Sequence, residues 1–259
     1  MFNLLVKTRK MEREEFDLRT PFTVIIEPTL DCNLACTYCY VGKSVEKGKM
    51  SRETLENATK KVSEFIGKGK EIDFLWHGGE PLLVGLDFYK QVIQVQKSLG
   101  EGYEIINSIQ SNGTLIDEEV ADFFKEYNFK VGLSLDGPQE LNDRTRQYKD
   151  GRGTFDDILN SIEILRKKGI ETNVIVTLNK QNINNIKQIY QFLKDYKINA
   201  RFNPVTISGR AIEHFQELAI SPDDYKKAKL KLYNLWIKDK QPPHLHCLEN
   251  TLKNILSEN

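Results

Sequence analysis

The sequence predicts an α/β protein in which six parallel strands alternate with helices. Short segments rich in β-branched and aromatic residues alternate with longer segments in which apolar residues recur at helical spacing. The strand segments are largely apolar, as in parallel sheets that helices cover. Cysteine, glycine, asparagine and aspartate residues cluster just after the strand segments, where α/β folds collect their ligands.

The first strand is expected at residues 21–29, where Pro28 marks the end of the segment PFTVIIEPT. The later strand segments share its mixture of β-branched and aromatic residues. They are expected at residues 71–79, 103–113, 129–137, 170–179 and 198–206.

The first helix is expected at residues 51–70, with Ser51 at its start. Further helices are expected at residues 86–100, 117–127, 154–169, 183–196 and 221–240, and a short final helix follows the break at Pro242 and Pro243. Strand–helix units in series are joined by right-handed crossovers, which permits either a doubly wound open sheet or a curved partial barrel. Periodicity alone does not separate the two.

The composition excludes several functional classes. Among the 259 residues, Lys plus Arg equals Asp plus Glu at 37 each, so no bulk field favours nucleic acid or an anionic membrane. No apolar stretch is long enough to cross a bilayer, and the N-terminus shows no secretory signal. These features predict a cytoplasmic protein with neither a nucleic-acid nor a membrane partner.

Three of the four cysteines fall within the segment TLDCNLACTYCY, as Cys32, Cys36 and Cys39. Cysteines of a cytoplasmic chain favour metal or redox chemistry over disulfides. The three positions share a helical face, so simple packing is an alternative, but their place directly after a strand favours ligation. Structural zinc takes four ligands and no second pair is evident, whereas clustered thiolates suit iron and sulfur.

Three thiolates leave one iron of a [4Fe–4S] cube without a protein ligand, as in reactive metal centres. The motif Cys32-x3-Cys36-x2-Cys39 followed by Tyr40 resembles the signature of the radical S-adenosylmethionine (SAM) superfamily. The resemblance implies a partial (β/α)6, TIM-like barrel of parallel strands with outer helices. It also implies a [4Fe–4S] cluster held by the three cysteines and SAM bound at the unique iron. In that family the reduced cluster cleaves SAM to methionine and a 5′-deoxyadenosyl radical, which abstracts hydrogen from the substrate.

The segment after the second strand resembles the family's GGEP motif, whose backbone and acidic side chain receive the amino group of the cofactor. Here it consists of Gly78, Gly79 and Glu80, followed by Pro81. Glycines permit a close backbone approach, and a carboxylate accepts hydrogen bonds from an ammonium group. An ordinary glycine turn is the alternative interpretation.

Residues of other loops resemble positions that contact the cofactor's ribose and carboxylate. A guanidinium binds a carboxylate through paired hydrogen bonds, which suits Arg146, although Arg144 competes for the role. Many relatives have His where this chain has Asn142. For Tyr38 and for Tyr40 there are three alternatives: the side chain covers the cluster, stacks near the adenine of the cofactor, or only packs against the rest of the protein. The further cofactor-binding candidates are Tyr38, Ser111, Asn112, Ser134, Asp136 and Arg146.

The motifs together resemble a peptide-modifying subgroup that includes maturases of ribosomal peptides and anaerobic sulfatase maturases. Members typically continue into a SPASM or twitch region with auxiliary clusters, but only Cys247 follows Cys39 here. Cys247 is expected to pack on a helix, and metal binding together with His244 and His246 is the alternative. We expect a leader at residues 1–20, a radical SAM barrel at 21–210 and a helical extension at 211–259 that leads into a missing region. A single-cluster enzyme is the alternative.

The resemblance implies an enzyme that abstracts hydrogen from a peptide or protein substrate to form a thioether or carbon–carbon crosslink. An anaerobic sulfatase maturase, which oxidises Ser or Cys to formylglycine, is the alternative enzyme. A non-catalytic iron–sulfur or zinc-binding module is a third possibility, but it would have no use for Glu80 and Arg146. The implied partners are the substrate and an electron donor such as flavodoxin or ferredoxin.

Overall fold

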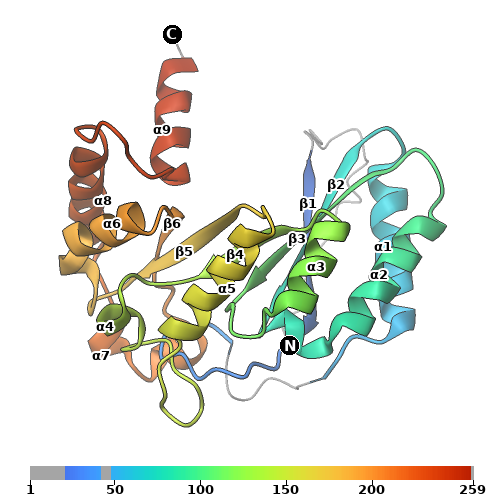
Figure 1. The fold of residues 1–259 in the computed structure, drawn as a ribbon, viewed down its shortest axis with the longest axis horizontal. Coiled ribbons are helices and arrows are strands. Elements are labelled where there is room, and N and C mark those ends of the chain that lie inside the picture. Colours follow the sequence, from blue (N-terminus) through green and yellow to red (C-terminus); the bar gives the residue numbers. More distant parts are fainter. Residues whose placement is uncertain (1–20, 42–47, 258–259) are drawn as a thin grey trace, which may run out of the picture.

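The computed structural model describes residues 21–41 and 48–257, so the expected leader at 1–20 lies outside the described residues. Six parallel strands form one sheet, in which they follow the order of the chain (Figure 1). Each predicted strand segment contains one of them. They are β1 Phe22–Thr29, β2 Glu71–Gly78, β3 Glu104–Ser111, β4 Lys130–Ser134, β5 Thr172–Leu178 and β6 Asn199–Pro204.

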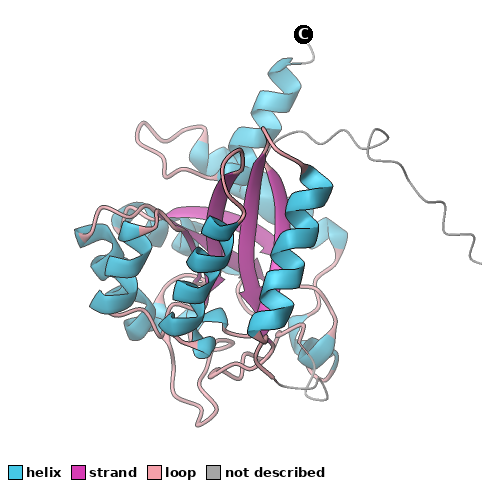
Figure 2. Ribbon diagram, turned by 90° about the vertical axis from the view of Figure 1, so that its right-hand side faces the viewer, coloured by secondary structure: helices cyan, strands magenta, loops and turns pink. Residues whose placement is uncertain are grey.

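The strand order decides between the two predicted architectures. In a doubly wound sheet the order reverses at a switch point, which places helices on both faces. Here every crossover moves to the next strand in the same direction, so right-handed crossovers place the helices on one face. Figure 2 shows the strands curving inside a layer of helices. The partial barrel of parallel strands with outer helices is therefore confirmed.

The long helices are those that the apolar spacing predicts. They are α1 Arg52–Ile66, α2 Leu86–Ser98, α3 Glu118–Glu126, α5 Phe155–Lys167, α6 Ile186–Asp195, α8 Pro222–Trp236 and α9 His246–Ser257. Helix α1 ends before residue 70 because Gly67, at φ 80°, leaves the helical conformation. The helix expected at residues 183–196 is divided into the 3-10 turn η3 Ile183–Asn185 and α6. The sequence did not predict the short α4 Gln139–Asn142, α7 Phe215–Leu218, η2 Pro81–Val84 and η4 Gly209–Ile212, because one turn carries no apolar period.

The two faces of the sheet differ in chemistry, as β2 illustrates. Ile72, Phe74 and Trp76 are fully buried in the core cluster, whereas the alternate residues Asp73 and His77 are only half-buried. The core therefore lies between the sheet and its helices. The inner face of the open barrel keeps polar side chains, and the site lies at its carboxyl end.

Strand β6 forms one end of the sheet, and its outer edge is partly covered. The backbone N–H of Ala200 donates to the carbonyl of His244 over 2.9 Å, and Leu245 bridges to Ala200 in parallel register. Helix α9 then extends away from the barrel (Figure 1). None of the described helices is long and apolar enough to cross a membrane.

Candidate active site

The three clustered cysteines lie on the loop that leaves the carboxyl end of β1. This loop is tied to the one that follows α4, because the N–H of Ala35 donates to the carbonyl of Gln147 over 2.7 Å. The N–H of Cys39 donates to the carbonyl of Cys36 over 3.2 Å, so these two cysteines share a tight turn. All three thiols are free and half-buried. The loop is thus a preformed backbone structure with its thiols available.

Hydrogen-bond donors surround the first of these thiols. The sulfur of Cys32 accepts from the N–H of Leu34 at 3.4 Å and from Nδ2 of Asn112 at 3.7 Å. Asn112 also donates to Oδ1 of Asn33 over 2.9 Å, and Asn33 donates to Thr114 over 2.8 Å. Donors of this kind stabilise a metal-bound thiolate. Asn33 and Thr114 were not predicted, and adjacency to the cysteine motif was the only sequence signal for Asn33.

The donor set fits an iron–sulfur cluster. Burial raises the pKa of Cys36 to about 12, although Arg146 opposes the rise, and burial also raises the pKa of Cys32. Binding of iron would therefore release protons from these thiols. Among the described residues, no group of three or more His, Cys, Asp or Glu surrounds one position for a metal ion. A [4Fe–4S] cluster does not require several ligands around a single ion, because each thiolate binds a different iron. Soft thiolates on one loop therefore suit such a cluster.

Glu80 joins the ends of β2 and β3. Its fully buried carboxylate accepts from Leu82 N–H at 3.0 Å, from Ser111 Oγ at 2.9 Å and from Asn112 N–H at 2.7 Å. Burial raises the pKa of Glu80 to about 7, although the three donors oppose the rise. A carboxylate has about four acceptor positions. Three are in use, which leaves room for about one donor from a ligand.

The two glycines before Glu80 allow β2 to approach the start of the cysteine loop. Gly78 has a φ of 112°, and a Cβ there would lie 2.4 Å from the Thr29 carbonyl oxygen. A Cβ at Gly79 would lie 2.1 Å from the carbonyl oxygen of Asp31. The Gly79 N–H donates to the Thr29 carbonyl over 3.0 Å. In this structure the glycines are therefore required by backbone contacts within the protein, and their contact with a cofactor stays a prediction.

Asp136 connects several loops at the carboxyl ends of the strands, which together form the mouth of the barrel. Its fully buried carboxylate accepts from the hydroxyl of Tyr38, from Arg146 Nε at 3.2 Å and from Thr145 Oγ1 at 3.4 Å. It also accepts from the N–H of Thr177 on β5 at 2.8 Å. Burial raises the pKa of the Tyr38 phenol well above its usual range. Tyr38 therefore links the cysteine loop to the end of β4.

The structure distinguishes the two competing arginines. Arg146 is buried, pairs with Asp136 and stacks over the Tyr38 ring with its guanidinium carbon 5.2 Å from the ring centroid. In the described part of the chain, its two terminal nitrogens make no hydrogen bond. Arg144 is exposed and donates to the carbonyl of Gln181 over 3.3 Å. Arg146 is thus the arginine at the mouth.

The remaining predicted residues lie in different surroundings. Ser134 accepts a hydrogen bond from Gln110 over 3.1 Å on the inner face. Asn142 is buried, and its Oδ1 accepts from the Asp136 N–H over 3.2 Å, so the departure from His at this position leaves the loop ordered. Cys247 packs against the core cluster on α9, as predicted. Tyr40 is exposed and bonds to His77 Nδ1 over 3.2 Å.

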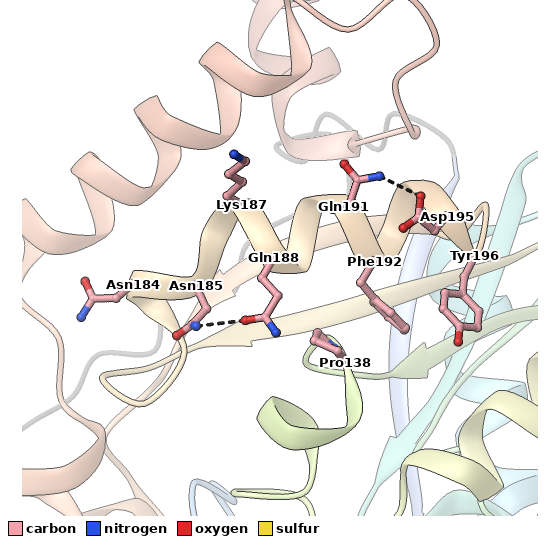
Figure 3. Close-up of a pocket in the computed structure, with 9 residues that line it drawn as sticks. All are labelled: Pro138, Asn184, Asn185, Lys187, Gln188, Gln191, Phe192, Asp195 and Tyr196. Carbon is pink, nitrogen blue, oxygen red and sulfur yellow. Dashed lines mark hydrogen bonds between the residues drawn. The ribbon is translucent and has the colours of Figure 1, made fainter.

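A separate cavity of about 560 Å³ lies against α6 (Figure 3). It shares no residue with the cysteine loop, Glu80 or Arg146. Two of its amides bond within the lining, since Asn185 donates to Gln188 over 3.1 Å and Gln191 donates to Asp195 over 2.7 Å. The lining residues are Pro138, Asn184, Asn185, Lys187, Gln188, Gln191, Phe192, Asp195 and Tyr196. The mouth, not this cavity, is the candidate active site.

An open parallel barrel with three free thiols on its first loop defines an iron–sulfur α/β protein. The chain belongs to the Radical SAM superfamily, whose family model matches residues 26–193. Membership brings the family's cofactors, a [4Fe–4S] cluster and SAM.

Several relatives are anaerobic sulfatase-maturating enzymes. The serine-type enzyme of Bacteroides thetaiotaomicron is 33% identical over 263 residues, which cover 92% of this chain and 63% of the relative. The cysteine-type enzyme of Clostridium novyi is 35% identical over 227 residues, which cover 84% of this chain and 60% of the relative. The chain thus spans less than two thirds of the length of these relatives.

Solved structures show the same fold. The structure of native anSMEcpe with bound AdoMet matches with a TM-score of 0.81 at 31% identity, covering 91% of this chain and 66% of that one. A structure of native anSMEcpe with bound AdoMet and the Cp18Cys peptide matches with a TM-score of 0.80 at 30% identity, covering 90% and 66%. The structure of Streptococcus suis SuiB bound to precursor peptide SuiA matches with a TM-score of 0.63 and covers 87% of this chain and 48% of that one. At 15% identity, this match shows likeness of fold alone.

Proposed function

We propose that this chain is the catalytic core of a radical SAM maturase that removes hydrogen from a side chain of a peptide or protein. One observation carries the proposal: the cysteine loop and the Arg146–Asp136 pair meet at one mouth through Tyr38. Protein groups that would hold a cluster therefore adjoin groups that would hold a charged small molecule. An iron–sulfur or zinc-binding module would need no such second set.

In this proposal Cys32, Cys36 and Cys39 hold three irons of the cluster. When bound, the reduced cluster supplies an electron that cleaves SAM to methionine and a 5′-deoxyadenosyl radical. The terminal nitrogens of Arg146 bind the carboxylate of SAM, and Asp136 holds the guanidinium in place.

The proposed amino-group contacts come from the segment after β2. The remaining acceptor position of Glu80 receives the ammonium of SAM, with the backbone at Gly78 and Gly79 beside it. Tyr38, Ser111, Asn112 and Ser134 complete the proposed binding region. The hydroxyl of Ser111 is buried and donates to Glu80, so it acts by fixing that carboxylate.

Among the two chemistries expected from the sequence, the comparisons favour formylglycine formation. The two relatives described above, at 33% and 35% identity, are sulfatase-maturating enzymes, one of the serine type and one of the cysteine type. The SuiB structure, at 15% identity, shows likeness of fold alone and therefore does not support the crosslinking alternative. We therefore propose a Ser or Cys side chain in a sulfatase-like protein as the substrate. A flavodoxin or ferredoxin is the proposed electron donor, and the proposed boundaries remain 21–210 for the barrel and 211–259 for the extension.

The first test is anaerobic reconstitution with iron and sulfide, followed by dithionite and SAM. We expect a cluster, and we expect 5′-deoxyadenosine by mass spectrometry. Cys36→Ala should abolish both, whereas Cys247→Ala, which changes a packed thiol on α9, should not. A correctly clustered protein that releases no 5′-deoxyadenosine would contradict the proposal.

The second test distinguishes the substrates. Sulfatase-derived peptides containing Ser or Cys are incubated with the reconstituted protein, and the products are treated with an aldehyde-reactive hydroxylamine. Formylglycine forms an oxime, whereas a thioether or carbon–carbon crosslink does not. Loss of a hydrogen pair without oxime formation would overturn formylglycine formation in favour of crosslinking.

A further inference from the structure

A segment that follows β6 contacts the cysteine loop from the opposite end of the sheet. The backbone N–H of Arg210 donates to the carbonyl of Cys39 over 2.9 Å. Its side chain donates through Nη1 to the carbonyl of Cys36 over 3.1 Å. One residue thus binds both carbonyls of the Cys36–Cys39 turn, although it lies 174 positions from Cys36.

Gly209 allows the close approach that these bonds require. Its φ is 55°, a conformation that L side chains rarely adopt. A Cβ there would lie 2.2 Å from the carbonyl oxygen of Tyr40 and 2.8 Å from that of Cys39. The two constraints act independently, because one arises from backbone conformation and the other from contact with the loop.

The contact joins the two ends of an open sheet. Strands β1 and β6 stand at opposite ends of the strand order, and the cysteine loop follows β1 while Gly209 and Arg210 follow β6. The turn of Cys36 and Cys39 is therefore held by the far end of the barrel as well as by its own strand. Loss of this contact would leave the turn attached through β1 and through the loop after α4.

Arg210 also brings an unused donor. Its Nε is buried and has no hydrogen-bond partner within the described part of the chain. Arginine remains protonated at every pH at which proteins are studied. A half-buried guanidinium on the cysteine turn would stabilise the additional negative charge that a bound cluster acquires on reduction, because the effective dielectric constant there is below that of water.

We propose that Gly209 and Arg210 form a latch that positions the Cys36–Cys39 turn for the cluster and supplies it with a permanent positive charge. The proposal rests on the cluster site of the proposed function. Arg210 acts through the cysteine turn and is a positioning residue. Two separable effects follow: the contacts with the two carbonyls slow the loss of iron, and the charge raises the reduction potential.

The test compares the reconstituted wild-type protein with Arg210→Gln and Arg210→Lys. Iron loss to a chelator is followed by absorbance, and the reduction potential is determined by redox titration with electron paramagnetic resonance. For Arg210→Gln we expect iron loss about tenfold faster, since a hydrogen bond from a charged group is removed. We also expect a reduction equilibrium about tenfold less favourable, or about 59 mV lower for one electron. Arg210→Lys should lose iron faster but keep most of the potential.

Matched variants separate the latch from general damage. Arg166 is an exposed arginine that donates to the backbone carbonyl of Tyr196 over 2.7 Å, so Arg166→Gln removes the same type of bond away from the mouth. Gly209→Ala keeps the charge but forces the segment away from Tyr40, and it should lose iron faster than Gly100→Ala. Gly100 has a φ of 75° with no atom within 4 Å of an added Cβ, so its substitution carries only the backbone strain.

Hydrogen exchange of the cluster-free protein provides a readout that needs no metal. The amide of Arg210, which donates to Cys39, should exchange faster in Gly209→Ala than in Gly100→Ala. If Arg210→Gln and Arg166→Gln lose iron at the same rate and have the same reduction potential, the latch is overturned while the proposed function stands. If the wild-type protein does not cleave SAM, the proposed function is wrong. The comparison of hydrogen exchange in Gly209→Ala and Gly100→Ala would still decide whether the latch exists.

Discussion

The substitution Glu80→Gln tests the electrostatics of the mouth directly. The carboxyl group is fully buried and accepts three hydrogen bonds, from Leu82, Ser111 and Asn112. Burial raises its pKa from 4.5 to about 7 in the folded protein, although these donors oppose the rise. Glutamine has nearly the same shape and carries no charge at any pH.

The sign of the pH dependence follows from these pKa values. Between pH 4.5 and about 7 the folded protein binds more protons at Glu80 than the unfolded chain does. The contribution of this group to stability is therefore complete below pH 4.5 and is lost as the pH rises through 7. Each pKa unit corresponds to about 1.4 kcal/mol, so the loss in the free energy of unfolding amounts to about 3 kcal/mol.

The assay is urea unfolding of the cluster-free protein between about pH 4.5 and about pH 8. The free energy of unfolding of the wild type minus that of Glu80→Gln should fall by about 3 kcal/mol across this range. Glu64→Gln, which removes an exposed carboxylate on α1, is the control for the loss of one negative charge. A difference for Glu80→Gln that stays constant across the pH range would refute the reasoning, and a rising difference would show that the three donors outweigh the burial.

Three further predictions concern the same region. In the cluster-free protein, Cys36 should have a thiolate fraction near pH 8 about 1000-fold below that of a thiol with the ordinary pKa of 9.0. Its alkylation, followed by peptide mass spectrometry, should therefore be slow beside that of the same cysteine in the urea-unfolded chain, and it should still accelerate above pH 9. Asp136→Asn leaves Arg146 buried without its ion-pair partner and should lower the free energy of urea unfolding by about 3 to 5 kcal/mol. Gly79→Ala places a Cβ against a backbone carbonyl and should cost about 1 to 3 kcal/mol, visible as a lower Tm.

Each of these predictions has a control and a contradicting outcome. An alkylation rate of Cys36 in the folded protein equal to its rate in the urea-unfolded chain would show that burial does not raise the pKa of this thiol. Asp122→Asn removes an exposed ion pair with Lys168 and should lower the free energy of unfolding far less than Asp136→Asn does, so an equal cost at the two positions would contradict the connecting role of Asp136. Gly48→Ala adds a Cβ in open space, and a matching fall in Tm there would remove the case for close contact at Gly79.

Much of the fold was predictable because its signals are local. Apolar spacing predicted the long helices, and β-branched segments predicted the six strands. The short turns such as η4 carry no period and were missed. The choice between a doubly wound sheet and a partial barrel depends on which strands pair, and that is a long-range property of packing.

The candidate site divides in the same way. Spacing alone brought together Cys32, Cys36 and Cys39, and the residues clustered after the strand segments were predicted to lie where α/β folds collect their ligands. Contacts between distant loops were not predictable. Only the structure showed that Tyr38 binds Asp136 and that Arg146, not Arg144, is buried at the mouth.

The sequence by itself determined the chemistry available to this protein: three soft thiolates after the first strand, and a carboxylate and a guanidinium at later strand ends. The tertiary structure decided how those groups are held. Glu80 is held by donors from the end of β3, and the cysteine turn is held by Arg210 from beyond β6. The physical reason is that residue type and spacing are local properties, whereas burial and hydrogen-bond partners arise only when distant segments pack together.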